Sequence, residues 1–249
     1  MIRRCAAIAI LVPAVAVAHP IEPLVTGSPM PVDQDWLAAD SVYSALHGDG
    51  TEQAIALALS AGIGGYAELS VATTIDATEG SVGPVLVGGK FMLAMEGRRG
   101  IDLSVAAIFS SGGAASGSLL IGRSLIPGFY LQASAGVAGS SGPSLTARAT
   151  HLALGPAPRH STDLPIGDDI IIVHGAAALQ WAPRPRWIPT LEARVAGTWD
   201  PLGHHDDAEI VPELIYLIEM NHLSIKAGVP VGVTGELSYG FIGALDWQR

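Results

Sequence analysis

Residues 233–247 read Val-Thr-Gly-Glu-Leu-Ser-Tyr-Gly-Phe-Ile-Gly-Ala-Leu-Asp-Trp, and this stretch decides the fold class. Its odd positions carry apolar or aromatic residues and glycine, whereas its even positions carry mainly small and polar residues. A repeat of two places one set on each face of a β-strand. One face suits hydrocarbon and the other suits a more polar interior, which is the pattern of a strand in a membrane β-barrel.

The same alternation recurs along the chain from residue 52 onward. It predicts strands at 52–61, 64–74, 83–96, 100–110, 117–125, 128–138, 144–154, 169–181, 187–198, 208–218, 222–230 and 234–248. Single-chain bacterial barrels have an even number of strands, each of about 9 to 11 residues. The sequence therefore predicts an all-β protein, folded as a single antiparallel transmembrane β-barrel of about 12 strands.

Hydropathy supports a membrane protein that lacks membrane-spanning helices. The mean hydropathy is +0.41 and only 14% of the residues are charged, yet no apolar run after residue 18 reaches the length of a spanning helix. Helices and closed barrels are the structures that satisfy every backbone polar group inside a bilayer. A chain whose apolar residues are spread over many short segments therefore favours the barrel.

The first residues have the order of a cleavable signal peptide. Arg3 and Arg4 precede an apolar stretch of about 13 residues that ends in small residues at Ala18. That stretch is shorter than the roughly 20 residues of a spanning helix, so we expect cleavage and not a membrane anchor. The predicted organisation is a signal peptide at 1–18, an N-terminal periplasmic segment at 19–51 with a helical stretch near 36–46, and a β-barrel domain at 52–249.

Cleavage would remove Cys5, the only cysteine, so disulfides and thiolate chemistry are excluded for the mature chain. It would also leave 11 basic residues (13 less Arg3 and Arg4) against 23 acidic ones, a formal net charge of −12. This balance disfavours nucleic acid as a partner. The expected partners are outer-membrane lipid, the barrel-insertion machinery and a small solute of unknown identity, for a monomer in the outer membrane of a Gram-negative bacterium.

Several charged residues fall on the predicted lumen side of the strands. In a barrel they either line a solute path or pair with one another inside a closed interior, because buried charges are normally paired. The candidates for lining the lumen or setting its selectivity are Lys90, Arg123, Arg148, Glu192, Arg194 and Lys226. Glu192 and Arg194 lie two residues apart and so share a face of one strand.

Catalytic, cofactor-binding and metal-binding residues are not predicted. The sequence His204-His-Asp-Asp207 offers metal-ligand chemistry, but its spacing matches no helical or finger-type zinc site, and a solvated external loop is the expectation. His151 and His174 lie on predicted strands near many serines. They leave an outer-membrane hydrolase open as an alternative, although no Gly-x-Ser-x-Gly motif accompanies them.

The longer breaks between predicted strands, 155–168 and 199–207, are candidate external loops, because outer-membrane barrels have short periplasmic turns and longer loops outside. Six aromatic residues lie near predicted strand ends. We expect them to form belts at the two membrane interfaces, where amphipathic rings are favoured. They are Tyr66, Trp181, Trp187, Trp199, Tyr216 and Trp247.

Two C-terminal segments carry a family resemblance. Residues 209–216 read Glu-Ile-Val-Pro-Glu-Leu-Ile-Tyr, and residues 223–232 read Leu-Ser-Ile-Lys-Ala-Gly-Val-Pro-Val-Gly. They resemble the closing strands of small outer-membrane transporter-like β-barrels of the meta-pathway phenol-degradation family. A looser similarity covers Tyr66-Ala-Glu-Leu and the run from Gly83 to Lys90. The chain departs from that family by ending in Trp247-Gln-Arg249 and not on the aromatic residue itself.

The resemblance implies an outer-membrane barrel and supplies no catalytic residues. Together with the residue patterns it favours a porin-like transporter or channel for a small molecule, with apolar molecules among the candidates. A soluble periplasmic barrel or sandwich is the first alternative. In that protein the apolar face of each strand would point inward and the polar face would meet water. A membrane barrel has the reverse arrangement, with the apolar face outside.

Overall fold

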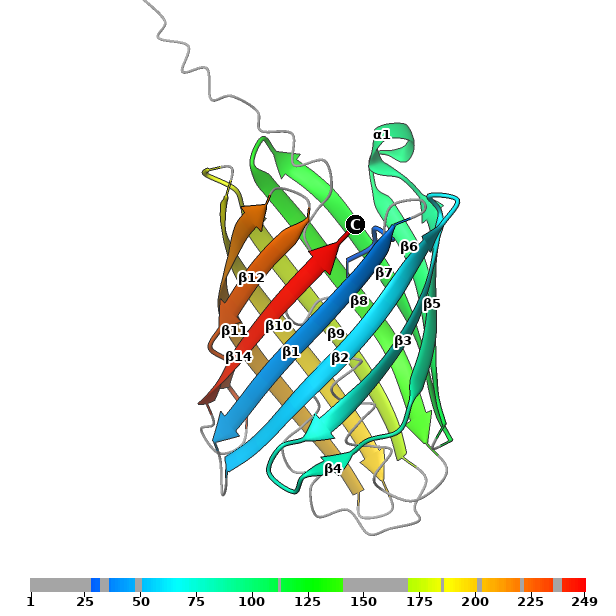
Figure 1. Ribbon diagram of the computed structural model, residues 1–249, viewed down its shortest axis with the longest axis vertical. Helices are drawn as coiled ribbons and strands as arrows, with labels where there is room; N and C mark the ends of the chain where they lie inside the picture. The colour runs from blue at the N-terminus through cyan, green and yellow to red at the C-terminus, as the bar shows by residue number, and fades with distance from the viewer. Residues whose placement is uncertain are drawn as a thin grey trace, which may run out of the picture.

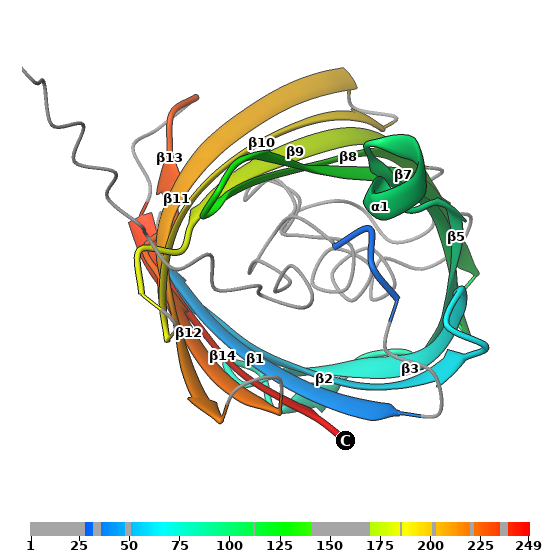
Figure 2. The ribbon, with the colours of Figure 1, turned by 90° about the horizontal axis from the view of Figure 1, so that it is seen from above.

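A computed structural model describes residues 28–31, 36–47, 51–111, 113–140, 170–184, 186–200, 203–219, 222–234 and 239–249. Twelve strands form one closed antiparallel ring, which confirms the predicted fold class (Figures 1 and 2). In ring order they are β1 (Leu37–His47), β2 (Thr51–Ile63), β3 (Ala67–Asp76), β5 (Leu86–Ala94), β6 (Asp102–Ser110), β7 (Ala114–Ile126), β8 (Phe129–Ser140), β9 (Ile170–Trp181), β10 (Trp187–Asp200), β11 (Gly203–Glu219), β12 (Leu223–Gly228) and β14 (Tyr239–Gln248).

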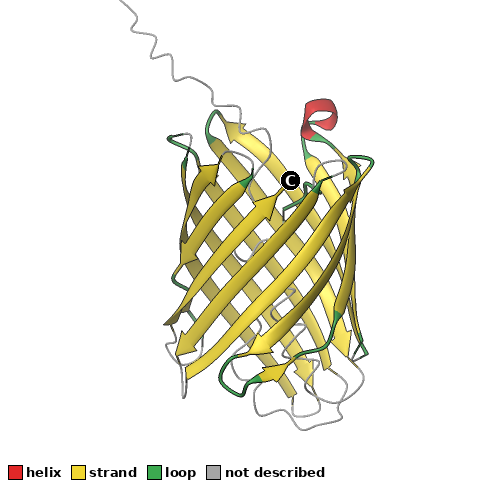
Figure 3. Ribbon diagram, viewed as in Figure 1, coloured by secondary structure: helices red, strands yellow, loops and turns green. Residues whose placement is uncertain are grey.

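Three short elements complete the described structure. β4 (Ser81–Val82) pairs with the end of β3, and β13 (Val231–Gly232) lies beyond β12 between β11 and β14. The helix α1 (Glu96–Arg99) connects β5 to β6 and is the single red element of Figure 3. Among the described residues, no helix is long and apolar enough to cross a membrane.

The ring is closed by the first and last strands of the chain. β1 pairs with β14 from Ala38 opposite Gln248 to His47 opposite Tyr239, and β1 also pairs with β2 along its length. Every wall strand thus has two neighbours, so the backbone N–H and C=O groups of the wall bond to one another.

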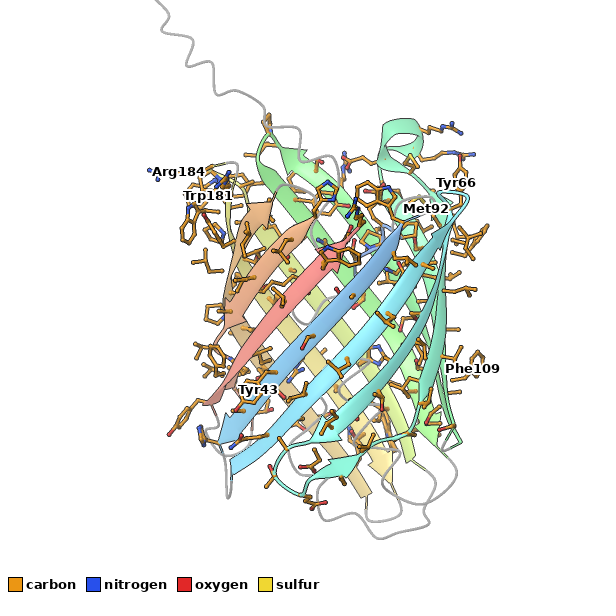
Figure 4. The ribbon with its side chains drawn as sticks, viewed as in Figure 1. Tyr43, Tyr66, Met92, Phe109, Trp181 and Arg184 are labelled. Atoms are coloured by element: carbon orange, nitrogen blue, oxygen red, sulfur yellow. The ribbon has the colours of Figure 1, made fainter. Side chains whose placement is uncertain are left out.

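Apolar side chains cover the outside of the wall. Leu59 and Phe109 are 60% and 62% exposed, whereas Glu192 on the inside is fully buried. Figure 4 shows Phe109 and Trp181 projecting outward from the strands. The alternation therefore has its apolar face outside and its polar face inside, which is the arrangement of a membrane barrel and the reverse of a soluble one.

The two ends of the barrel differ in their connections. We call the end that carries α1, the turns at 64–66, 127–128 and 182–186, and Arg249 the α1 rim (Figure 1). The opposite end, with β4 and the β10–β11 turn, is the β4 rim. The long connection between β8 and β9, residues 141–169, joins the wall at the β4 rim, because β8 pairs with β9 from Phe129 opposite Trp181 to Ser140 opposite Ile170.

Three expectations differ from the structure. The helix predicted near residues 36–46 is wrong, because Leu37–His47 form β1 and the wall begins there and not at residue 52. The break predicted at 199–207 is also wrong, because β10 and β11 continue to Asp200 and Gly203 and pair up to those residues. The predicted strand 144–154 and loop 155–168 lie outside the described residues, and the ring closes through β8 and β9 without them.

The aromatic residues gather at both rims. At the α1 rim the rings of Trp187 and Tyr216 lie 4.6 Å apart, and those of Phe129 and Trp181 lie 5.9 Å apart. The β4 rim has its own set, in which Trp199 and His204 stack with their centroids 4.4 Å apart. Tyr66 lies at the α1 rim, and Tyr43 and Phe109 lie toward the β4 rim (Figure 4). On β14, Trp247 lies at the α1 rim, and Tyr239 and Phe241 lie toward the β4 rim. These positions match the belts expected at two membrane interfaces.

Candidate functional site

The lumen is the candidate site, because it collects the charged side chains of the wall. Between the rims, the acidic side chains that the structure places on the inner face are Asp40, Glu68, Asp102, Glu192, Asp207, Glu209, Glu213 and Asp246. The basic side chains described there are Lys90, Arg194 and Lys226. The described inner wall therefore carries eight carboxyl groups and three basic groups.

The strands β10 and β11 hold the first ion pair. Arg194 lies directly opposite Glu209 in the ladder, and its guanidinium donates to the Glu209 carboxylate. Side chains directly opposite each other share a face and lie close enough to interact. Glu192, two residues from Arg194, is fully buried on the same face. Two carboxyl groups, those of Glu192 and Glu209, therefore lie near Arg194 on this part of the inner wall.

A second ion pair joins β12 to β14. The Lys226 ammonium contacts the Asp246 carboxylate, which also accepts a hydrogen bond of 3.2 Å from the Ser224 hydroxyl. Asp40 of β1 lies directly opposite Asp246, so the two carboxyl groups share the inner face. Lys226 therefore adds a positive charge at the place where the first and last strands of the chain meet.

The opposite wall of the lumen holds a third pair and a segment from near the N-terminus. Lys90 Nζ lies 3.3 Å from Glu68 Oε2 and donates to the carbonyl oxygen of Met30, also at 3.3 Å. The Ser104 hydroxyl donates to the carbonyl oxygen of Pro29. Figure 2 shows this short segment, residues 28–31, inside the ring of strands.

A glycine on β7 makes room for this segment. A Cβ added to Gly122 would lie 2.8 Å from Pro29 Cγ and would overlap the Tyr130 hydroxyl. Pro29 is among the most buried residues of the protein, and Ser28 is only 4% exposed. The segment is thus packed against β5, β6 and β7, and it narrows the half of the lumen next to the α1 rim.

Tyr130 and Asp102 fix the neighbouring part of the wall to α1. The Tyr130 hydroxyl donates to Asp102 Oδ2 at 2.6 Å, and the Glu96 backbone N–H donates to Asp102 Oδ1 at 2.7 Å. The Glu96 carboxylate in turn accepts hydrogen bonds from the Ser124 backbone N–H and hydroxyl. Asp102 therefore acts as a structural acceptor that joins β6, β8 and the first turn of α1.

The structure divides the six predicted lumen residues. Lys90, Glu192, Arg194 and Lys226 are on the inner face, on strands from both sides of the barrel. The lumen position predicted for Arg123 is wrong, because Arg123 is exposed on the outer face of β7, the face that also carries Leu119 and Ile121. It lies near the end of β7, where a long arginine can reach water at the membrane interface. Arg148 lies outside the described residues.

The histidines form no recognisable catalytic or metal centre in the described part of the chain. His174 Nε2 and the Ser118 hydroxyl are 3.4 Å apart inside the barrel. Within the ranges that the structure describes, no group of three or more His, Cys, Asp or Glu side chains could hold a metal ion. His204 belongs to β11 and not to a loop, where it stacks on Trp199 and lies 3.0 Å from Asp206. His151 lies outside the described residues.

Solved outer-membrane channels share this architecture. The NanC porin aligns with a TM-score of 0.58 over 84% of this chain and 98% of its own, at 8% identity. The KdgM porin in complex with disordered oligogalacturonate gives 0.55 over 84% and 98%, at 9% identity. An outer-membrane channel from Pseudomonas putida F1 gives 0.55 over 92% and 99%, at 8% identity. The chain has the fold of the small outer-membrane β-barrel channels.

At these identities the likeness shows the barrel fold alone. No protein-family model matches the chain, and no curated protein sequence matches it. The function of this outer-membrane-type barrel must therefore be argued from its own lumen.

Proposed function

We propose that the protein is a narrow channel of the outer membrane that passes small cations and neutral polar solutes in preference to anions. The observation that carries this proposal is the charge of the described inner wall, eight carboxyl groups against three basic groups. Fixed charges of one sign in a confined, low-dielectric path concentrate ions of the opposite sign.

The outer surface supports a membrane location. Large apolar side chains are exposed on every wall strand, and aromatic rings gather at both ends of the apolar band. No wall connection at the α1 rim is longer than seven residues, whereas the β4 rim receives the long connection 141–169. Barrels of this class have short periplasmic turns and longer external loops, so we place the α1 rim in the periplasm.

The charge of the lumen argues against a transfer of substrate from the similar porins. Oligogalacturonate, the ligand present with the KdgM porin, is a chain of sugar acids, and its charge would be repelled by an acidic inner wall. A small apolar molecule is the other solute class expected from the sequence. The inward-facing apolar cluster of Ile188, Ile215 and Leu217 is buried and offers almost no surface to such a molecule.

Ion preference measured in a planar bilayer tests the proposal. Purified protein in a salt gradient should give a reversal potential of the sign that indicates cation preference. Arg194→Ala should increase that preference, because it removes a positive charge from the inner wall and leaves Glu209 in place. Arg123→Ala is the matched control, since it removes an arginine from the outer face and should leave the ion preference unchanged.

Three outcomes would contradict the proposal in different ways. Anion preference in the unmodified protein would overturn the assigned selectivity. If Arg194→Ala leaves the ion preference as unchanged as Arg123→Ala does, Arg194 does not contribute to selectivity. Recovery of the protein as a soluble periplasmic species without detergent would overturn the membrane location itself.

A further inference from the structure

The exposed arginines are concentrated at one end of the barrel. Of the eleven arginines in the sequence, six are exposed at or next to the α1 rim, and Arg194 faces the lumen. The remaining four, Arg3, Arg4, Arg148 and Arg159, lie outside the described residues. We call the six the arginine rim, and they are Arg98, Arg99, Arg123, Arg184, Arg186 and Arg249.

Backbone contacts fix several of these arginines at the same end of the wall. Arg249 exchanges two backbone hydrogen bonds with Leu37, at 2.7 and 2.8 Å, and the Leu217 N–H donates to the Arg186 carbonyl at 2.9 Å. The Ala182 N–H donates to the Gly128 carbonyl, which links the β9–β10 turn to the β7–β8 turn. Arg98 and Arg99 lie on α1 at the same end (Figure 1).

The arginine rim lies directly beyond an aromatic belt. Figure 4 shows Arg184 beside Trp181 at the edge of the wall, and Arg186 is next in sequence to Trp187. Both tryptophans are more than 40% exposed. Tryptophan rings sit at the level of lipid headgroups, and arginines just outside them reach the phosphate layer with their guanidinium groups.

The described residues of the opposite rim carry the opposite charge. Among the described residues there, Glu79 and Asp206 are exposed, and no lysine or arginine is present. At the α1 rim, by contrast, the acidic side chains whose exposure is described are at least partly buried, and Glu96 accepts hydrogen bonds from Ser124.

We propose that the arginine rim binds the phosphate groups of anionic phospholipids in the periplasmic leaflet. Guanidinium groups pair with phosphate through two parallel hydrogen bonds, and clusters of basic residues at a membrane edge select anionic headgroups. The periplasmic leaflet is assigned because the wall connections at this rim are all short and the long connection 141–169 joins the opposite rim. The inference rests on the proposed membrane location, and it concerns a surface outside the lumen.

The test compares lipid binding by three forms of the protein. Each is reconstituted in vesicles of equal phosphatidylcholine and phosphatidylglycerol, released in mild detergent, and analysed by native mass spectrometry for retained lipid. The unmodified protein should retain phosphatidylglycerol several-fold over phosphatidylcholine. The variant Arg98→Gln, Arg99→Gln, Arg184→Gln, Arg186→Gln should lose this enrichment, whereas Glu79→Gln with Asp206→Asn should keep it.

A separate readout keeps failure of folding or insertion distinct from failure of lipid binding. All three forms should show heat-modifiable gel migration and bilayer conductance, because the substituted side chains lie outside the lumen. Unchanged enrichment in the four-arginine variant that still conducts would overturn the lipid site and leave the channel intact. Displacement of phosphatidylglycerol by lipopolysaccharide from the unmodified protein, at equal phosphate, would overturn the assignment to the periplasmic leaflet.

Discussion

Lys226 is one of three basic side chains on the described inner wall, and its partner Asp246 lies on the last strand. Lys226→Met should destabilise the barrel by about 3 kcal/mol, because it leaves a buried carboxylate without its counter-charge. Combining it with Asp246→Leu should restore most of the loss, since it removes that charge as well. Urea titration in lipid vesicles, followed by tryptophan fluorescence, measures both. Equal losses in the single and the double variant would show that the pair is not the cause.

A substitution at Gly122 can test whether the segment 28–31 narrows the lumen. Gly122→Ala adds a methyl group where Pro29 Cγ and the Tyr130 hydroxyl already lie, so the segment 28–31 should be displaced and single-channel conductance should rise. Gly117→Ala is the matched control on the same strand, because the nearest atom to its added Cβ is the Ala106 carbonyl oxygen at 4.0 Å. A conductance that changes equally in both variants, or in neither, would contradict a narrowing role for the segment.

At the level of single residues, the sequence was informative wherever strand parity was clear. Lys226 sits between Ile225 and Ala227 in an unbroken alternation, and the structure places it inside. Arg123 follows three consecutive apolar residues, Leu119 to Ile121, which leave the parity of β7 ambiguous in the sequence, and its expected face was wrong. The position of Pro29 could not be predicted, because a proline-rich extended segment carries no pattern that identifies what it packs against.

Among the elements, the pairing of β1 with β14 closes the ring, and a disulfide crosslink between these strands can test it. Ser41 of β1 lies directly opposite Leu245 of β14. Facing residues in an antiparallel pair have Cα atoms about 4.5 to 5.5 Å apart, which is within the range that a disulfide spans. Ser41→Cys with Leu245→Cys, in a chain without Cys5, should therefore form a crosslink on oxidation. The readout is the mobility of the unfolded chain on a non-reducing gel.

The control for this crosslink moves one cysteine along β14 by two residues. Gly243 faces Tyr43, so Ser41→Cys with Gly243→Cys places the pair on a diagonal of about 7 to 8 Å, and it should crosslink poorly. Equal crosslinking of both pairs, or of neither, would contradict the register of β1 against β14.

The strands were predicted well where bulky and polar residues alternate, and poorly where they do not. In β14, Phe241, Leu245 and Trp247 mark the outer face without ambiguity. β1 was missed because Ala38, Ala39 and Ser41 occupy both of its faces, and small residues carry little information about which side meets lipid. Tertiary pairing with β2 and β14 decided its conformation, which local sequence alone does not reveal.

For the whole molecule, the arrangement of the connections predicts its direction in the membrane. A cysteine in place of Glu79, at the β4 rim, should react with a large membrane-impermeant maleimide on intact cells. A cysteine in place of Gly97, in α1, should react only after the outer membrane is permeabilised. The reverse labelling pattern would invert the assigned orientation, and the lipid leaflet proposed for the arginine rim would then be wrong.

The pairing of β1 with β14 has a consequence for biogenesis. Residues that begin the wall and residues that end it are neighbours, although about two hundred positions separate them in the chain. Contacts of such long range form late, since the loop entropy is lost before they contribute. A nascent chain truncated before Tyr239 would leave β1 and β12 with exposed edges and would remain a target for periplasmic proteolysis. Ring closure therefore depends on synthesis of the chain through β14.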